Sequence, residues 1–123
     1  MQPTVLIIDD DPDLVRLMAK FLKLEGFAPV SAANGREALA YLQSGGEASV
    51  ILLDLRMPEM DGWAFRAAQR SDPAIAHIPV IVVSGVDAWS GPQDLEAAAV
   101  FEKPASFSDV IKTVRRLCSS KGA

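Results

Sequence analysis

The sequence contains very little cysteine or histidine, and it has no long hydrophobic run. Its single cysteine, Cys118, cannot close a disulfide within the chain, which is typical of proteins from a reducing compartment. Its single histidine, His77, lies in a predicted loop, without a partner for metal ligation or for a catalytic triad. No apolar run approaches the roughly 18 residues of a membrane span, and no signal-peptide pattern opens the chain. We therefore expect a cytoplasmic protein with no membrane contact.

Positive charge is also scarce, because 12 lysines and arginines face 16 aspartates and glutamates, for a net charge of −4. Domains that bind nucleic acids usually carry the opposite sign, so we expect no direct nucleic-acid contact. The chain also lacks the P-loop and the GxGxxG pattern of common nucleotide-binding sites. One basic cluster near the C-terminus is either a solvated helix face or a docking patch for a partner protein. It comprises Lys112, Arg115, Arg116 and Lys121.

The length of 123 residues predicts a single domain that spans residues 1–123. Half of the residues (50%) are hydrophobic, which is ordinary for a globular protein. A domain of this length buries roughly two-thirds of its unfolded surface, so it needs neither disulfides nor structural metals to fold.

Three apolar stretches have the character of buried parallel strands, which read as continuous β-branched runs. They are residues 4–8, 49–53 and 79–83, and a weaker strand at 28–32 and a short one at 99–102 complete a set of five. Segments with helical periodicity alternate with them, at 12–25, 35–44, 62–70, 93–98 and around 110–117. This alternation predicts an α/β fold, in which helices cover both faces of a five-stranded parallel sheet.

Several residues mark where the predicted helices begin and end. Asp11 precedes Pro12, a pair that predicts an N-cap followed by proline at the first helical position. Gly26 follows the first helix as a C′ residue. Asp61-Gly62 predicts a turn that opens the third helix, and we assign it no chemistry.

Four of the predicted strands end on chemically reactive side chains. The first leads to Asp9 and Asp10, the third to Asp54, the fourth to Ser84 and the fifth to Lys103. The carboxyl ends of parallel strands meet at one edge of the sheet, and open α/β sheets bind their ligands there. Three carboxylates, a hydroxyl and an ammonium group at this edge indicate a divalent cation and a phosphoryl group.

The three carboxylates would repel one another unless a cation neutralised them. Mg²⁺ takes oxygen ligands and typically uses one or two carboxylates together with waters and phosphate oxygens. Asp9 and Asp10 alone would read as a solvated turn, but Asp54 adds a third carboxylate at the same edge. With a cation bound, Asp54 can act as a nucleophile toward phosphorus and form an acyl phosphate.

Ser84 and Lys103 would each have an ordinary structural reading if they stood alone, as a turn residue and a solvated side chain. Together they offer a hydroxyl donor and a point charge to phosphoryl oxygens. Pro104 directly follows Lys103, so the bond between them could be cis and fix the direction of the lysine.

Four motifs together make the chain resemble the receiver domain of two-component response regulators, of the single-domain chemotaxis type, over essentially its full length. The motifs are Ile8-Asp9-Asp10-Asp11, Asp54-Leu-Arg-Met-Pro-Glu-Met-Asp-Gly62, Val83-Ser84-Gly85 and Glu102-Lys103-Pro104. The resemblance implies a flavodoxin-like, doubly wound parallel sheet with strand order 2-1-3-4-5, flanked by five helices. In that order the first and third strands are neighbours, so their terminal carboxylates adjoin.

The resemblance also implies a role for each of these side chains. Asp54 is similar to the phosphoacceptor, and Ser84 and Lys103 are similar to the hydroxyl and the lysine that grip the phosphoryl group. The cofactor implied is Mg²⁺, or Mn²⁺ in its place. The ligands implied for it are Asp9, Asp10, Asp54 and the backbone carbonyl of Arg56.

The function that the resemblance implies is a phosphorylation-dependent signalling switch. The phosphodonor would be a phosphohistidine on a sensor histidine kinase or on a histidine phosphotransfer protein, and a downstream protein target would read the result. The chain would not be an enzyme toward other substrates, because it would catalyse only its own phosphorylation and dephosphorylation. Ser84 would move toward the phosphoryl group and bias a two-state surface around the fourth helix, fifth strand and fifth helix.

Three departures from the family pattern concern the switch. The family usually has an aromatic residue three positions before the lysine, where this chain has Val100, and Phe101 should face the other side of the strand. The stretch between Ser84 and Lys103 is short, so the fourth helix should be short or shifted. Arg56 stands two residues after the phosphoacceptor, where we expect it to tune the lifetime of the phosphoryl group.

Two other functions compete with this interpretation. Asp9-x-Asp11 after an apolar strand imitates a haloacid-dehalogenase-like phosphatase, but that reading leaves Asp54 unexplained. A degenerate receiver that acts as a constitutive binding module is the second alternative, and Val100 and the short or shifted fourth helix favour it. The chain is either free-standing or part of a larger regulator or hybrid kinase. Because no output domain follows the fifth helix, it should act through a partner.

Overall fold

The computed structural model describes residues 2–85 and 95–122. Its five strands form one parallel sheet in the order β2-β1-β3-β4-β5. The strands are β1 (Thr4–Ile8), β2 (Ala28–Ala32), β3 (Val50–Leu53), β4 (Val80–Ser84) and β5 (Ala99–Glu102). The predicted α/β class and the doubly wound strand order are confirmed.

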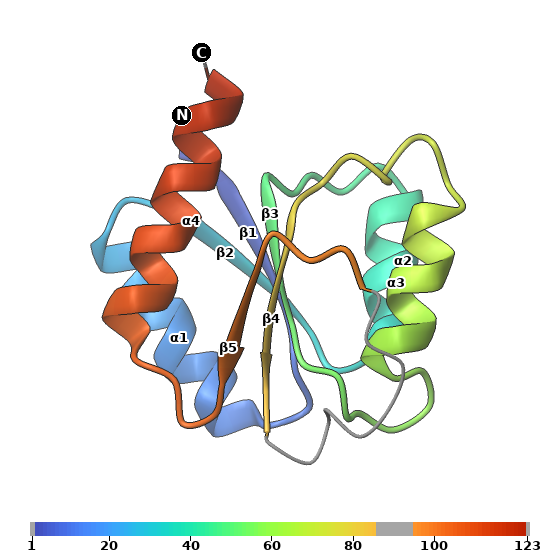
Figure 1. Ribbon diagram of the computed structural model, residues 1–123, viewed down its shortest axis with the longest axis horizontal. Coiled ribbons are helices and arrows are strands. Elements are labelled where there is room, and N and C mark those ends of the chain that lie inside the picture. The colour runs from blue at the N-terminus through green and yellow to red at the C-terminus, as the bar shows by residue number, and fades with distance from the viewer. Residues whose placement is uncertain (1, 86–94, 123) are drawn as a thin grey trace.

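The described helices cover both faces of the sheet, with α1 and α4 on one face and α2 and α3 on the other (Figure 1). Their bounds are α1 (Pro12–Leu24), α2 (Gly35–Gln43), α3 (Gly62–Arg70) and α4 (Phe107–Gly122). All strands run toward one edge of the sheet, while β1 begins and α4 ends at the opposite edge (Figure 1). No helix within residues 2–85 and 95–122 has the length and apolarity needed to span a bilayer.

The helix predicted at residues 93–98 is wrong for its described part. Residues 93 and 94 lie outside the described residues, and residues 95–98 are not helical. Glu96 has a φ of 48°, in the left-handed region that a helix excludes. The carbonyls of Leu95 and Glu96 accept hydrogen bonds from the Arg66 guanidinium, which replaces helical N–H donors. Four described helices therefore stand where the sequence predicted five.

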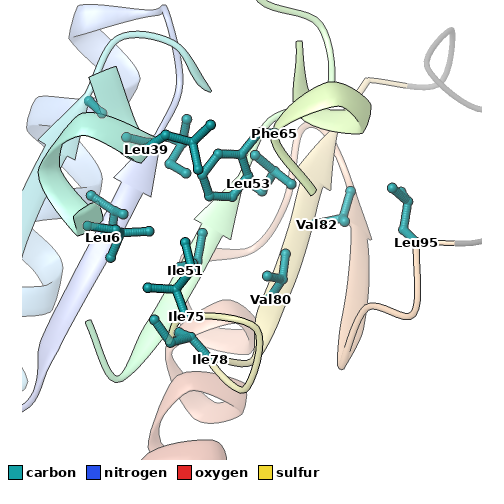
Figure 2. Close-up of a cluster of buried hydrophobic side chains, with 14 of the residues drawn as sticks. Leu6, Leu39, Ile51, Leu53, Phe65, Ile75, Ile78, Val80, Val82 and Leu95 are labelled. Atoms are coloured by element: carbon teal, nitrogen blue, oxygen red, sulfur yellow. The ribbon is translucent and has the colours of Figure 1, made fainter. Parts of the chain in front are cut away.

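Two apolar clusters, one on each face, hold the sheet between its helices. On β1, Leu6 and Ile8 belong to the α2/α3 cluster, whereas Val5 and Ile7 belong to the α1/α4 cluster. Figure 2 shows the first cluster, where Phe65 of α3 packs among side chains of the sheet and of α2. Burial on both faces explains why these strands read as continuous apolar runs. It also makes the sheet a rigid support for the groups at its carboxyl edge.

The predicted start of α1 is confirmed. The Asp11 side chain accepts hydrogen bonds from the backbone N–H groups of Asp13 (3.1 Å) and Leu14 (3.3 Å), and Pro12 is the first helical residue. Gly26 follows the helix with a φ of 92°, as expected for a C′ glycine. Asp61 caps α3 in the same way, through the N–H of Ala64.

Replacing Asp11 with alanine should destabilise the protein by about 1 kcal/mol, because two N–H groups of the first turn lose their acceptor. Urea denaturation at neutral pH measures the free energy of unfolding. Asp11→Ser is the matched control, since serine keeps a capping oxygen and should recover most of the loss. Equal stability of Asp11→Ala and the wild type would contradict the assignment of the cap.

Candidate functional site

Three aspartates meet at the carboxyl edge of the sheet, as predicted. In the pairing of β1 with β3, the last residues, Ile8 and Leu53, lie opposite each other. Asp9 and Asp54, the next residue of each strand's chain, therefore lie side by side at the sheet edge. Asp9 is 7% exposed and Asp54 is 6% exposed, whereas Asp10 is exposed. Carboxylate oxygens of the three residues lie within 4.8 Å of one another. The site is therefore a buried acidic pair with a third carboxylate at its open side.

Lys103 reaches this acidic group from the end of β5. Its Nζ lies 2.9 Å from Asp9 Oδ2 and 3.6 Å from Asp54 Oδ2. Its backbone N–H donates to the carbonyl of Ser84 at 2.8 Å, which ties the end of β5 to the end of β4. The bond between Lys103 and Pro104 is cis, as the sequence suggested. One ammonium group thus contacts two of the three carboxylates.

Ser84 completes the group of five predicted side chains. Its hydroxyl donates to Asp54 Oδ1 at 3.0 Å and accepts from the N–H of Leu55 at 3.3 Å. The residue is 1% exposed, so this hydroxyl is held inside the site. Ser84 therefore contacts Asp54 directly.

Burial and neighbouring charges shift the protonation of the two central groups. The pKa of Asp54 is raised, first by desolvation and then by the negative charge of Asp9, against the opposing effect of Lys103. Burial alone would lower the pKa of Lys103, but the hydrogen bond to Asp9 and the charges of Asp9 and Asp54 together raise it. The ammonium therefore stays charged at neutral pH. Its single positive charge does not neutralise the three carboxylates.

Asp54→Asn should stabilise the metal-free protein at pH 7. A raised carboxyl pKa means that the folded state retains a proton that the unfolded state releases, so stability falls as pH rises from about 3.8 through the folded pKa. Asparagine removes this loss, while Lys103 keeps its closer partner, Asp9.

Thermal unfolding in EDTA at pH 3 and pH 7 measures the effect. Each kcal/mol should raise the Tm by roughly 4 °C for a domain of this size. The gain should be present at pH 7 and absent at pH 3. A gain of equal size at both pH values would mean that the ionisation of Asp54 is not its cause.

The acidic group fits a small divalent cation. Asp9, Asp10 and Asp54 supply only carboxylate oxygens, the ligand type that Mg²⁺ and Mn²⁺ prefer. The backbone N–H of Arg56 donates to Asp54 Oδ1 at 3.4 Å, and its side chain is exposed. The metal-ligand role of the Arg56 carbonyl and the effect of Arg56 on phosphoryl lifetime stay predictions.

The surroundings of the site contain two features that bear on the predictions. Val100 is 47% exposed, while Phe101 packs against the α1/α4 cluster, so the two side chains face opposite sides of β5 as expected.

Arg66 of α3 was not singled out from the sequence, although it is buried and binds the chain just before β5. An arginine in an amphipathic helix ordinarily reads as a solvated residue, so no sequence signal marked it.

Comparisons with known proteins agree with this geometry. The family model of the response regulator receiver domain matches residues 5–115. The C4-dicarboxylate transport transcriptional regulatory protein DctD of Rhizobium meliloti is 45% identical over 84 residues, which cover 68% of this chain and 17% of that protein. The chain thus spans less than a fifth of the length of this curated relative.

Solved structures show the same fold. The signal receiver domain of a signal transduction histidine kinase from Syntrophus aciditrophicus has a TM-score of 0.88 at 28% identity, covering 96% of this chain and 91% of that chain. The response regulator protein TrrA of Thermotoga maritima, in complex with Mg²⁺–BeF, has a TM-score of 0.83 at 25% identity, covering 94% and 99%.

Proposed function

This chain belongs to the response regulator receiver domain family, and we propose that it is a phosphorylation-dependent switch in which Asp54 accepts the phosphoryl group. Receiver domains work with histidine kinases and downstream effectors. The donor proposed here is a phosphohistidine on a sensor histidine kinase or on a histidine phosphotransfer protein. The observation that carries the proposal is the contact of the buried Asp54 carboxylate with both Ser84 and Lys103.

The proposed reaction is an in-line displacement at phosphorus. A carboxylate oxygen of Asp54 attacks the phosphoryl group, a P–O bond forms, and the P–N bond to the donor imidazole breaks. The imidazole leaves with the electron pair of that bond and takes up a proton. In the return reaction, water attacks phosphorus, the P–O bond to Asp54 breaks, and inorganic phosphate is released.

The side chains of the site support this reaction by position and charge. Lys103 lies between Asp9 and Asp54, where its ammonium can neutralise charge that builds on the phosphoryl oxygens. The Ser84 hydroxyl donates to the same carboxylate, where it could donate to a phosphoryl oxygen, and the N–H of Leu55 holds that hydroxyl in place. Burial excludes most water from Asp54, which strengthens each of these interactions.

Asp9, Asp10 and Asp54 would hold a Mg²⁺ or Mn²⁺ ion, with the Arg56 carbonyl as the further predicted ligand. When bound, such an ion neutralises the charge of the acidic group and of the phosphoryl oxygens. The chain's own contribution is the fixed spacing of the carboxylates, which the paired ends of β1 and β3 provide.

The output of the switch is proposed to be binding of a downstream protein. The chain would act on no other substrate, since the site serves only its own phosphorylation and dephosphorylation. A cytoplasmic location belongs to the same proposal, together with the absence of direct contacts to nucleic acid or membrane. Since the curated relative DctD is much longer than this chain, activities of the rest of that protein are not transferred.

Incubation with acetyl phosphate and MgCl₂, followed by intact-mass measurement, tests the proposal. The wild type should gain one phosphoryl group, and Asp54→Asn should gain none. Asp72→Asn is the matched control, because Asp72 lies in the loop after α3 and away from the site. Failure of the wild type to gain mass with either Mg²⁺ or Mn²⁺ would refute phosphorylation and leave the constitutive binding module.

A further inference from the structure

Arg66 is a buried charged residue that the proposed reaction does not use. It lies on α3, is 7% exposed, and makes three hydrogen bonds to other described residues, all to uncharged oxygens. Its guanidinium donates to the carbonyls of Leu95 (2.8 Å) and Glu96 (3.0 Å) and to the side-chain oxygen of Gln69 (2.7 Å). A buried guanidinium with such partners holds specific backbone segments in place.

Gln69 extends this contact to a second segment. It is fully buried, and its side-chain N–H groups donate to the carbonyls of Ile75 (2.9 Å) and Ile78 (3.1 Å). Residues 75–78 lead into β4, just as residues 95–98 lead into β5. The Arg66–Gln69 pair therefore binds the approaches to the two strands that carry Ser84 and Lys103.

β5 has particular need of such support. It has four residues, lies at the edge of the sheet and, among the described strands, pairs with β4 alone. On one face of β5 the side chain of Val100 is half exposed. Burial therefore specifies the register of β5 less strongly than the register of the inner strands. Hydrogen bonds from Ala98 N–H to Val80 and from Lys103 N–H to Ser84 bracket the pairing at its two ends.

Stability alone does not account for a buried arginine at this position. Apolar residues of similar volume often stabilise a protein as well as buried charged groups do, because charges lose their hydration. Desolvation is also the main cause that lowers the pKa of Arg66. What an apolar residue cannot do is bind the two carbonyls of Leu95 and Glu96 in one fixed arrangement.

We propose that Arg66, together with Gln69, is a positioning residue for the phosphoacceptor site. By binding the approaches to β4 and β5 to α3, the pair sets the register of β5 against β4 and so places Lys103 beside Ser84 and Asp54. Neither residue touches the reacting atoms. This inference rests on the proposed phosphorylation of Asp54 for its effect on rate, but its effect on β5 is independent of that reaction.

Arg66→Met tests the proposal, with Arg70→Met as the matched control on the same helix. Arg70 pairs with the side-chain carboxylate of Glu96. Arg70→Met removes that ion pair and leaves the hydrogen bonds of Arg66 to the backbone carbonyls of Leu95 and Glu96 intact. The first measurement is amide hydrogen exchange of Ala98 and Lys103, relative to Ile51 and Leu53 of the central strand. Arg66→Met should speed exchange at the β5 amides by at least about tenfold, and Arg70→Met should not.

The second measurement is the rate of phosphorylation by acetyl phosphate at saturating Mg²⁺. Arg66→Met should lower it by about tenfold to a hundredfold through misplacement of Lys103, and Gln69→Leu should act in the same direction. Leu42→Ala, a core truncation on α2, controls for general loss of stability and should leave the rate near that of the wild type at temperatures where it is folded.

Three outcomes decide the matter. Unchanged β5 exchange in Arg66→Met would overturn the proposal, and so would an equal fall in phosphorylation rate in Arg66→Met and Leu42→Ala. Faster β5 exchange with a slower reaction in Arg66→Met alone would support it. If the wild type took up no phosphoryl group, the proposed function would fail, and hydrogen exchange would still decide whether Arg66 sets the position of β5.

Discussion

Lys103→Met should slow the phosphorylation of Asp54 by acetyl phosphate by about 100- to 1000-fold, the usual cost of removing one preorganised charge from a reaction site. The ammonium lies 2.9 Å from Asp9 and 3.6 Å from Asp54, and methionine keeps the length of the side chain without its charge. Single-turnover kinetics at saturating Mg²⁺, followed by intact mass, measures the rate.

The same substitution should tighten Mg²⁺ binding, because the ammonium and a cation compete for the same carboxylates. Isothermal titration calorimetry measures the Kd for Mg²⁺, which should fall in Lys103→Met although the phosphorylation rate also falls. Lys112→Met, an exposed substitution on α4, controls for the loss of one positive charge and should change neither quantity. A variant at Lys103 with wild-type phosphorylation kinetics would show that the lysine has no part in the reaction.

Gly62→Ala should lower the free energy of unfolding by about 3 kcal/mol, at the upper end of ordinary overpacking effects. A Cβ at this position would lie 2.6 Å from the carbonyl oxygen of Asp54 and 2.7 Å from Leu55 Cα. Both are backbone atoms, so relief of the overlap requires a shift of the chain at Asp54 and Leu55. The gain in helix propensity from alanine, about 1 kcal/mol, does not offset this overlap.

Urea denaturation measures the loss, and Gly85→Ala supplies the contrast. Within residues 2–85 and 95–122, no atom lies within 4 Å of a Cβ added at Gly85, so that variant should change stability by less than about 0.5 kcal/mol. If Gly62→Ala were equally harmless, the close approach of α3 to the end of β3 would not constrain the site. The rate at which Gly62→Ala is phosphorylated by acetyl phosphate would show whether the substitution also displaces Asp54, the proposed phosphoacceptor.

Much of the fold and site could be predicted because the signals are local and the sheet is regular. Continuous β-branched runs give the strands, and a parallel sheet places Asp9, Asp54, Ser84 and Lys103 at one edge without further information. The capping pattern at Asp11 depends only on the next three residues. These features needed no knowledge of long-range contacts.

The features that sequence could not supply depend on tertiary contacts. Residues 95–98 have helix-compatible side chains, but Arg66 binds the carbonyls of Leu95 and Glu96 from 29 and 30 positions away, and Glu96 takes a left-handed conformation. Likewise, the contact of Ser84 with Asp54 depends on a side-chain orientation that no spacing specifies. A long-range partner decided the local structure in both cases.

Both ends of the described chain lie at the sheet edge opposite the acidic group, because β1 begins there and α4 ends there (Figure 1). A fluorescent reporter or a surface-immobilisation tag attached to either end would therefore stand away from Asp54. Kinetic and binding measurements on such fusions should reproduce those of the untagged protein. The same separation allows a pair of donor and acceptor dyes, one at a terminus and one near β5, to test the proposed switch in single molecules.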